Sequence, residues 1–402
     1  MLEEVPNVPP FDKNPKGGPQ IRDWRQLLRA FNAQLERAPV WLVESEWQYK
    51  LVGFPFAALI VSICFLFSAN NQQEWPLSTP SGLIAFHHPQ VNTAIRALLN
   101  EYSSFLNTTA STHVLNSSPH GWLSPSALSN LSSVADPIST PPRPFHELYE
   151  CSPHEPHYGY KTWDDFFTRR WRNISTLRPV GSPHNDLVIS NACESSPLVL
   201  AHNVSLESKF WVKGQPYSLQ DIFSSRELAE SFAGGTIYQA YLSALSYHRW
   251  HSPVSGRVKK VKNINGTYYA EHALQGFPGV WNGNGTRALP DVVSPDASQG
   301  YIAQTATRAV VVIEADEREK LGEVALVFVG MAEVSTAEVT VREGERVEKG
   351  DQLGMFHFGG STHLQIFEPH VKLEFRDEVY RADRNHTQDN LPVRGFLARV
   401  VS

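Results

Sequence analysis

A serine that follows two glycines could allow this chain to cut itself. Ser361 follows Gly359 and Gly360 near the C-terminal end of the sequence. Because Gly360 has no Cβ, the backbone there can adopt a strained conformation in which the serine hydroxyl attacks the preceding carbonyl. The resulting ester can eliminate to dehydroalanine, which hydrolyses to a pyruvoyl ketone. A Gly-Gly-Ser turn without any chemistry is the commoner use of this triplet, so the motif needs support from elsewhere in the chain.

Two histidines provide the proton-transfer groups that such chemistry needs. His248 and His251 lie three residues apart in the segment Ser-Tyr-His-Arg-Trp-His, at a predicted strand end or tight turn. Histidine titrates close to neutral pH, so it can both accept and release a proton there. The pair therefore predicts a catalytic role, whereas the alternative is that both side chains simply cap a strand.

These motifs, together with residues 166–170 and 350–354, resemble the phosphatidylserine decarboxylase family of pyruvoyl enzymes over roughly residues 164–367. The resemblance implies cleavage between Gly360 and Ser361, a pyruvoyl group made from Ser361, and two chains that stay associated. Longer stretches at residues 158–170, 190–195, 212–218 and 329–338 are similar to the fungal tryptophan decarboxylase branch of the family.

The resemblance also implies roles for individual residues. His251 would activate Ser361 for cleavage and His248 would serve protonation during decarboxylation, although the reverse assignment stays open. Glu194 stands where the family has an aspartate, and it is the expected partner of His251. Further residues are expected to contact the oxyanion or the substrate, namely Thr362, Ser335, Thr336 and Glu333, of which the last could instead face solvent.

A pyruvoyl group is the expected cofactor because loss of carbon dioxide leaves an electron pair at Cα that needs a conjugated acceptor. Pyridoxal phosphate is not expected, since Lys213 lacks a recognisable phosphate cradle nearby. A metal is not expected either, because His357 and His363 flank the cleavage site without the spacing of metal ligands.

Composition limits the partners and the compartment. The 402 residues carry a net charge of −6 and give a pI near 6.2, so no basic face for nucleic acid or anionic lipid is expected. Cys64, Cys151 and Cys193 have no paired spacing, which favours a reducing compartment. The N-terminal sequence lacks the pattern of a signal peptide, so we expect a cytoplasmic protein.

One apolar run, residues 54–67, spans about 14 positions and falls short of the ~20 residues that cross a bilayer. A membrane is therefore not an expected partner. By the resemblance, residues 61–73 have no counterpart in the fungal branch. We interpret them as a possible retained intron, because Val-Ser fits a splice donor and a terminal Gln fits an acceptor.

The predicted fold class is α+β, a helical N-terminal domain followed by a mainly antiparallel β catalytic domain. Residues 1–20 are expected to form a disordered arm, residues 21–150 the helical domain and linker, and residues 151–402 the decarboxylase domain. Apolar periodicity predicts helices from Asp23 and over 92–106, each with a buried face. Short helices are also expected at 124–132 and, from the Thr162 capping pattern, at 163–172.

After residue 179 the sequence changes to short β-prone runs separated by turns. The expected strands are 187–190, 198–202, 210–212, 236–250, 254–261, 309–314, 324–329, 337–341 and 353–358. Residues 275–300, rich in Gly, Pro and Asn, are expected to form a long loop.

The sequence thus predicts a pyruvoyl-dependent decarboxylase of a free L-amino acid, aromatic and with tryptophan first. Trp250, Tyr268, Tyr269 and Trp281 are candidates for a slot that holds the substrate side chain. Two alternatives stay open. One is a phosphatidylserine decarboxylase, and the other is a non-catalytic carrier, because residues 341–354 resemble the hairpin of lipoyl and biotinyl domains.

Overall fold

The computed structural model describes residues 23–42, 80–208, 217–270, 298–330, 336–357, 361–385 and 390–401. Several predicted features lie outside these residues. They are the N-terminal arm at 1–20, the apolar run at 54–67, the candidate intron at 61–73, the strand at 210–212, and the long loop up to residue 297.

The first helices follow the predicted apolar periodicity. Helix α5 (Pro89–Leu106) buries Asn92, Ile95, Leu99, Tyr102 and Leu106, which lie on one face at spacings of three and four residues. Helix α1 (Trp24–Gln34) begins where the Asp23 carboxylate accepts a hydrogen bond from the backbone N of Gln26. The predicted burial of its apolar face is wrong for Trp24 and Leu28, which are 58% and 53% exposed.

The capping residues also behave as expected. Ser124 caps α6 (Pro125–Ala135), and the Thr162 hydroxyl accepts from the backbone N of Asp165 at the start of α8 (Trp163–Phe167). Helix α8 is shorter than predicted, since Trp171 instead forms an antiparallel bridge with Tyr149. The remaining short helices here are α4 (Pro80–His87), η3 (Thr109–Val114), α7 (Phe145–Leu148), η4 (Pro156–Gly159) and α9 (Ile174–Leu177).

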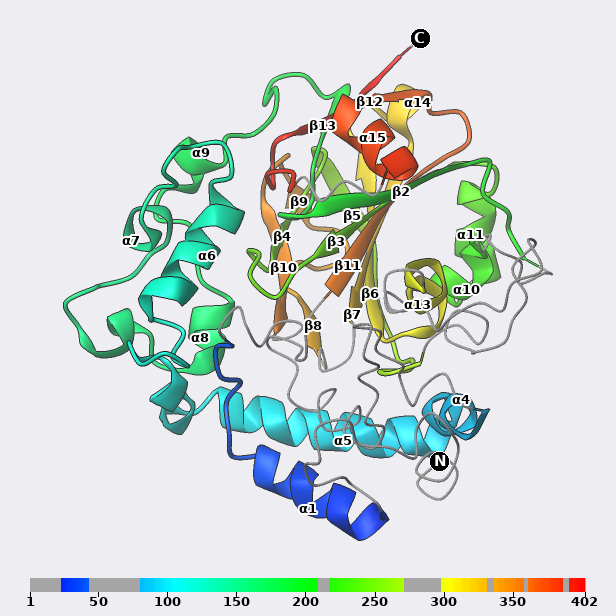
Figure 1. Ribbon diagram of the computed structural model, residues 1–402. Helices are drawn as coiled ribbons and strands as arrows, with labels where there is room; N and C mark the ends of the chain where they lie inside the picture. The colour runs from blue at the N-terminus through cyan, green and yellow to red at the C-terminus, as the bar shows by residue number, and fades with distance from the viewer. Residues whose placement is uncertain are drawn as a thin grey trace, which may run out of the picture.

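One hydrophobic cluster joins these helices, and it includes Trp41, Trp122, Trp163 and Phe166. The helices α6 to α9 flank the sheets, while α5 and α1 run below them (Figure 1). The cluster contains residues on both sides of position 150. Helices of the predicted N-terminal domain (21–150) therefore pack against helices of the predicted decarboxylase domain (151–402). The predicted domain limits themselves stay a prediction.

A seven-stranded sheet forms the centre of the molecule, in the order β2-β3-β11-β7-β6-β5-β9, and every pairing in it is antiparallel. The strands are β2 (Ser196–His202), β3 (Thr236–Leu242), β5 (Gly256–Ile264), β6 (Arg308–Ala315), β7 (Glu323–Gly330), β9 (Arg346–Val347) and β11 (Ser361–Phe367).

Two three-stranded antiparallel sheets accompany it, in the orders β1-β13-β12 and β4-β10-β8. Their strands are β1 (Val188–Ser190), β4 (Arg249–His251), β8 (Thr336–Val339), β10 (Gln352–His357), β12 (Leu373–Phe375) and β13 (Phe396–Val400). Helix α14 (Arg318–Leu321) precedes β7, and α15 (Asp377–Asn385) lies between β12 and β13.

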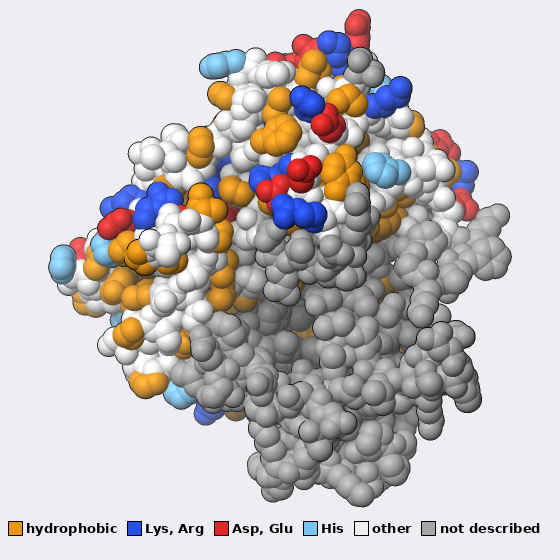
Figure 2. Space-filling view, turned by 45° about the horizontal axis from the view of Figure 1, so that its top comes forward, with side chains coloured by type: hydrophobic (Ala, Val, Ile, Leu, Met, Phe, Trp, Pro, Cys, Tyr) orange, Lys and Arg blue, Asp and Glu red, His pale blue; other side chains and the backbone are white. Residues whose placement is uncertain are grey.

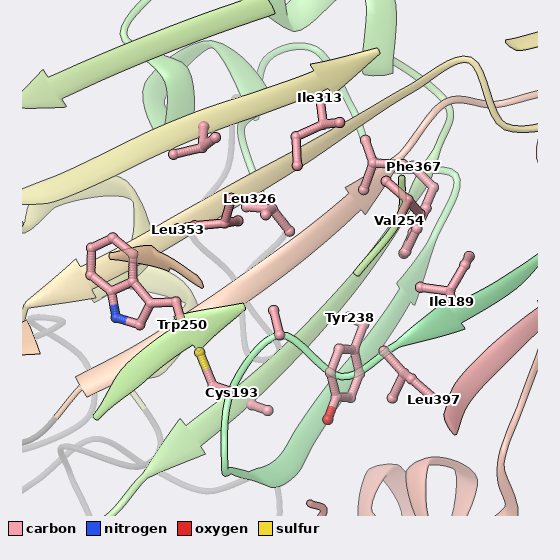
Figure 3. Packing of buried hydrophobic residues seen from close by; sticks show 14 of the residues in the cluster. Ile189, Cys193, Tyr238, Trp250, Val254, Ile313, Leu326, Leu353, Phe367 and Leu397 are labelled. Carbon is pink, nitrogen blue, oxygen red and sulfur yellow. The ribbon is translucent and has the colours of Figure 1, made fainter. Parts of the chain in front are cut away.

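The central sheet is buried on both faces, which explains its continuous apolar runs. One face packs against the two smaller sheets, and Figure 3 shows Tyr238, Trp250, Leu326, Leu353 and Leu397 pointing into this shared core. The other face packs against α10 (Leu219–Phe223), α11 (Arg226–Phe232) and α13 (Gln299–Thr305). On β7, Leu326 belongs to the first core and its neighbour Val327 to the second, as strand alternation requires.

The predicted α+β class with an antiparallel β core is confirmed. The single strand predicted at 236–250 is wrong, because β3 ends at Leu242 and β4 begins at Arg249 after a turn. Strand β11 is absent from the prediction. Within the described residues, no helix is long and apolar enough to span a bilayer. On the described part of the face in Figure 2, acidic and basic side chains lie among one another.

Candidate active site

Ser361 is the first residue of the central strand β11. Its backbone pairs with Leu242 of β3 on one side and Gly330 of β7 on the other. The side chain is fully buried, and its Oγ has no hydrogen-bond partner among the described residues. A buried hydroxyl that forms no hydrogen bond is costly and needs an explanation. A nucleophile that is held ready for reaction is one such explanation; Gly360 itself lies outside the described residues.

His248 lies in the turn before β4 with its ring against α8. The imidazole stacks on Phe167 with the ring centroids 3.9 Å apart and the planes at 17°. Neither ring nitrogen has a hydrogen-bond partner among the described residues, and the side chain is fully buried. Burial, helped by the charge of Arg169, lowers the pKa of His248 well below its usual value. The ring is therefore neutral at physiological pH and can accept a proton.

His251 is held by two hydrogen bonds that fix its tautomer. Its Nδ1 lies 2.8 Å from the carbonyl oxygen of Gly350, and its Nε2 lies 3.2 Å from the hydroxyl of Tyr247. A carbonyl only accepts, so Nδ1 carries the proton and Nε2 accepts from Tyr247. Burial is the main reason why the pKa of His251 falls to about 4. His251 is therefore also neutral near pH 7.

Glu194 does not hydrogen-bond to His251, so the expected contact is absent. Its two carboxylate oxygens each lie 2.7 Å from the Arg178 guanidinium, and they also accept from Asn390 Nδ2 and Val393 N at 3.0 Å each. A buried carboxylate is stable only when it is paired and hydrogen-bonded, and Arg178 satisfies that need. Whether Glu194 acts in the reaction stays a prediction.

The predicted oxyanion donors are placed only in part. The Thr362 hydroxyl donates to the Ala240 carbonyl at 2.9 Å and accepts from Gln239 Nε2 at 3.1 Å, so its hydrogen is already used. Thr362 also points to the face of β11 opposite Ser361. Ser335 and Glu333 lie outside the described residues, and only the backbone of Thr336 is described. The roles of these three residues stay predictions.

The aromatic residues proposed for a substrate slot are mostly packed in the interior. Trp250 stacks on Phe328 with centroids 3.9 Å apart and planes at 7°, so its assignment to a substrate slot is wrong. Tyr268 and Tyr269 are buried in the cluster of the N-terminal helices. Trp281 lies outside the described residues.

Two further histidines have contacts that the sequence did not indicate. His357 Nδ1 lies 2.9 Å and 3.0 Å from the two Asp164 oxygens, and its Nε2 lies 2.8 Å from Glu338 Oε2. The nitrogens contact the carboxylates directly, which leaves no space for a metal ion between them. No group of three His, Cys, Asp or Glu suited to a metal occurs in the described part of the chain. Asp164 and His357 are 193 residues apart, so no local pattern could have paired them.

His363 lies on the same face of β11 as Ser361, two residues further along. Its Nε2 is 3.0 Å from the Ser195 hydroxyl, which in turn donates to the Cys193 carbonyl at 3.1 Å. Nε2 therefore carries the proton, and Nδ1, which has no partner among the described residues, keeps its lone pair. Burial lowers the pKa of His363 to about 3. His363 is thus a third neutral imidazole, and it lies on the same strand as Ser361.

Comparison with known proteins assigns this chain to a family. The phosphatidylserine decarboxylase family model matches residues 163–386, which is more than half of the chain, and a second family model described as a phosphatidylserine decarboxylase matches residues 1–131. The chain belongs to the phosphatidylserine decarboxylase family. The first of these matches contains His248, His251 and Ser361. The predicted family and its fungal branch are therefore confirmed.

Curated fungal relatives in this phosphatidylserine decarboxylase family match most of the chain. Decarboxylase iboD of Amanita muscaria is 40% identical over 84% of this chain and 91% of its own length. L-tryptophan decarboxylase of Psilocybe cyanescens is 37% identical over 71% of this chain and 64% of its own length. L-tryptophan decarboxylase of Psilocybe cubensis is 34% identical over 85% of this chain and 72% of its own length. The expected enzyme class, a carboxy-lyase, is confirmed by these relatives.

Proposed function

We propose that this chain cleaves itself between Gly360 and Ser361 and then decarboxylates a free L-amino acid. The observation that carries the proposal is the Ser361 hydroxyl, which is buried without a hydrogen-bond partner in the described residues at the head of β11. The family membership supports the same serine, since its Tyr-His-Arg-x-His motif and Gly-Ser pair both occur here in order. A pyruvoyl group made from Ser361 would accept the electron pair that decarboxylation leaves at Cα.

Three buried histidines, of which His363 lies on the same face of β11 as Ser361, are candidates for the first requirement of self-cleavage, which is removal of the hydroxyl proton. The serine must lose it as Oγ attacks the carbonyl carbon of residue 360, and a neutral imidazole is the side chain suited to take it. His248, His251 and His363 are all buried and carry lowered pKa values. Each is therefore in the neutral form at the pH of a cell. His248 and His363 have a ring nitrogen without a hydrogen-bond partner in the described residues, whereas Nε2 of His251 already accepts from Tyr247.

Ser361 is also fixed in place before any reaction occurs. Antiparallel pairing runs along the whole of β11 on both sides, from Ser361 to Phe367. Such a strand keeps the serine backbone in one position, which reduces the entropy that attack on the neighbouring carbonyl must overcome. The first residue of a rigid central strand is thus a suitable place for an intrachain nucleophile.

We propose an aromatic amino acid as substrate, with tryptophan first, on the strength of the Psilocybe relatives, which are named L-tryptophan decarboxylases. Phosphatidylserine is the second candidate, because a Schizosaccharomyces pombe phosphatidylserine decarboxylase proenzyme is 32% identical over 60% of this chain and 22% of its own length. We favour the free amino acid, since the relatives matched over the larger part of this chain are not named as lipid enzymes.

The carrier alternative is less well supported. A lipoyl or biotinyl carrier needs an exposed lysine on its hairpin, and Lys349 is the lysine within residues 341–354. Its Nζ donates to the carbonyl oxygens of Ser182, Asn185 and Val188 at 2.7 to 2.9 Å. The side chain is buried, so a prosthetic group could not be attached to it without breaking these contacts.

Mass spectrometry and gel analysis of purified protein test the cleavage. We expect one chain that ends at Gly360 and a second of 42 residues, 361–402. Ser361→Ala should remain at full length. Ser190→Ala is a matched control, because Ser190 is also buried with no partner for its hydroxyl among the described residues, and it should be cleaved normally.

The substrate is tested with the cleaved protein. Release of carbon dioxide should be measured with L-tryptophan, L-tyrosine and L-phenylalanine, and separately with phosphatidylserine vesicles. Activity on the vesicles alone would overturn the amino acid assignment. A full-length protein that still releases carbon dioxide from any of these would overturn self-cleavage as the source of the cofactor.

A further inference from the structure

His357 is the last residue of β10, and only three residues separate it from Ser361. Its two ring nitrogens contact two carboxylates from distant parts of the chain, Asp164 on α8 and Glu338 on β8. We refer to these three side chains as the His357 clamp. Strand β10 belongs to a small sheet and β11 to the central sheet, so the clamp lies where the chain leaves one sheet for the other.

The geometry sets the charge of the ring. An ionised carboxylate only accepts hydrogen bonds, so a ring with carboxylate oxygens at both nitrogens must donate from both. His357 is then an imidazolium in contact with two anions. Its exposed fraction is only 14%, whereas Glu338 is 47% exposed and Asp164 is 8% exposed. The contact of His357 with Asp164 is therefore less exposed to solvent than its contact with Glu338, and it is the stronger of the two.

Other charged groups face the clamp and must be included. Arg249 of β4 interacts electrostatically with both Asp164 and Glu338, and Arg170 lies within electrostatic range of Arg249. These cations oppose a positive charge on His357. Burial is the largest single effect on the ring and acts to lower its pKa, but Asp164 and Glu338 together outweigh it, so the net effect raises the pKa of His357.

We propose that His357 is a positioning residue for self-cleavage, whose charged ring ties the end of β10 to α8 and β8 and so holds the chain on the amino side of Ser361. This inference rests on the self-cleavage proposed above. Ser361 is already fixed by β3 and β7, so the clamp would fix the other end of the same short segment. Attack on a neighbouring carbonyl depends steeply on such alignment.

The clamp makes cleavage dependent on pH, and the direction follows from its charges. His357 has a raised pKa in the folded chain, so its contribution is complete below the usual value of about 6.5 and is lost as the pH rises through the raised value. Once the ring is neutral, one nitrogen becomes an acceptor that faces a carboxylate, and that contact turns from attraction to repulsion.

The test follows cleavage of the full chain as a function of pH. Protein made by brief cell-free synthesis with a radioactive label would be diluted into buffers between pH 6 and pH 9, and the fragment 361–402 would be measured over time. For the wild type we expect the cleavage rate to fall about tenfold across this range, as for the loss of one charge-assisted hydrogen bond. Thermal melting in the same buffers checks that the chain remains folded.

Three variants and a control separate positioning from general damage. Glu338→Gln should move the fall in rate to lower pH, because one of the two carboxylates that hold the proton is gone. His357→Lys keeps a positive charge and should give a rate that changes little with pH, whereas His357→Gln should be slow throughout. His370→Gln is the control, since His370 also contacts a carboxylate, Glu368 at 3.3 Å, but on the exposed surface. It should behave as the wild type.

The outcomes distinguish this inference from the function on which it rests. A wild-type chain that is not cleaved at any pH would overturn the proposed function and the clamp with it. A wild-type chain that is cleaved at the same rate at every pH, with Glu338→Gln and His357→Gln unchanged, would overturn the clamp alone.

Discussion

Arg178 and Glu194 form a two-pronged ion pair in the interior of the protein. Arg178 Nε donates to Glu194 Oε2 and Arg178 Nη2 donates to Glu194 Oε1, both at 2.7 Å, and the two side chains are only 6% and 2% exposed. The guanidinium also lies over the Trp171 ring, 3.9 Å from its centroid. The pair connects the segment after α9 to the turn between β1 and β2, so its first role is in the fold.

Removing one partner of this pair should therefore destabilise the protein strongly. Glu194→Gln or Arg178→Met alone is expected to cost about 3–5 kcal/mol, because each leaves an uncompensated buried charge. The double variant should cost clearly less than the sum of the two. Urea unfolding of these variants in a Ser361→Ala background, where the chain stays intact, provides the measurement. If Glu194→Gln keeps full stability in that background and prevents cleavage when Ser361 is present, the role first expected for Glu194 beside His251 is restored.

The hydroxyl of Tyr247 should hold His251 in its neutral form. Tyr247 donates to Nε2, a hydrogen bond that the protonated ring cannot accept. Tyr247→Phe is therefore expected to raise the pKa of His251 from its lowered value and to cost about 1 kcal/mol of stability. An NMR titration of the histidine ring protons reports the shift. Tyr160→Phe is the matched control, since that hydroxyl donates to the Glu150 carbonyl instead of a histidine.

Acid should unfold this protein through its buried neutral histidines. Each of His248, His251 and His363 has a folded pKa below the unfolded value near 6.5, so the unfolded chain binds more protons as the pH falls. For His251 the shift to about 4 corresponds to about 3 kcal/mol, which would be lost between roughly pH 6.5 and pH 4. Urea unfolding at several pH values should show this slope, and His251→Gln should reduce it. An unchanged slope in His251→Gln would mean that His251 is accessible to protons in the fold.

Trp250 should matter for stability and not for substrate binding. Its ring stacks on Phe328 and meets Phe356 edge-on in the core shared by the sheets. Trp250→Ala is expected to cost about 3–5 kcal/mol through the cavity that it leaves. Trp24→Ala removes an equally large ring that is 58% exposed, and it should change stability by less than about 0.5 kcal/mol. Equal effects in thermal unfolding would contradict the assigned packing.

Local signals in the sequence predicted the local structure well. The Thr162 cap gave the start of α8, and the spacing of Ile95, Leu99 and Tyr102 gave the buried face of α5. The alternation of β-prone runs with turns gave the antiparallel core. Each of these depends on residues within a few positions of one another, which is the range over which periodicity and capping operate.

The missed features depend on distant residues. Strand β11 is central and buried, yet Ser361, His363 and Gln365 alternate along it, so it lacks the apolar run that marks the neighbouring strands. The aspartate expected by resemblance to assist His251 is a glutamate here, and its carboxylate pairs with Arg178, which only the folded chain shows. The contact between Asp164 and His357 is likewise invisible in sequence order.

Strand β11 would also determine what happens after the proposed cleavage. A fragment that starts at Ser361 would supply an interior strand of the seven-stranded sheet, hydrogen-bonded to β3 along one edge and to β7 along the other. The two pieces could separate only if the whole sheet came apart, and reassembly would then require two molecules to meet. The working lifetime of the cleaved protein would therefore be set by its rate of unfolding. Once the two fragments had separated and been diluted, they would rarely meet again, and the folded enzyme would be lost irreversibly.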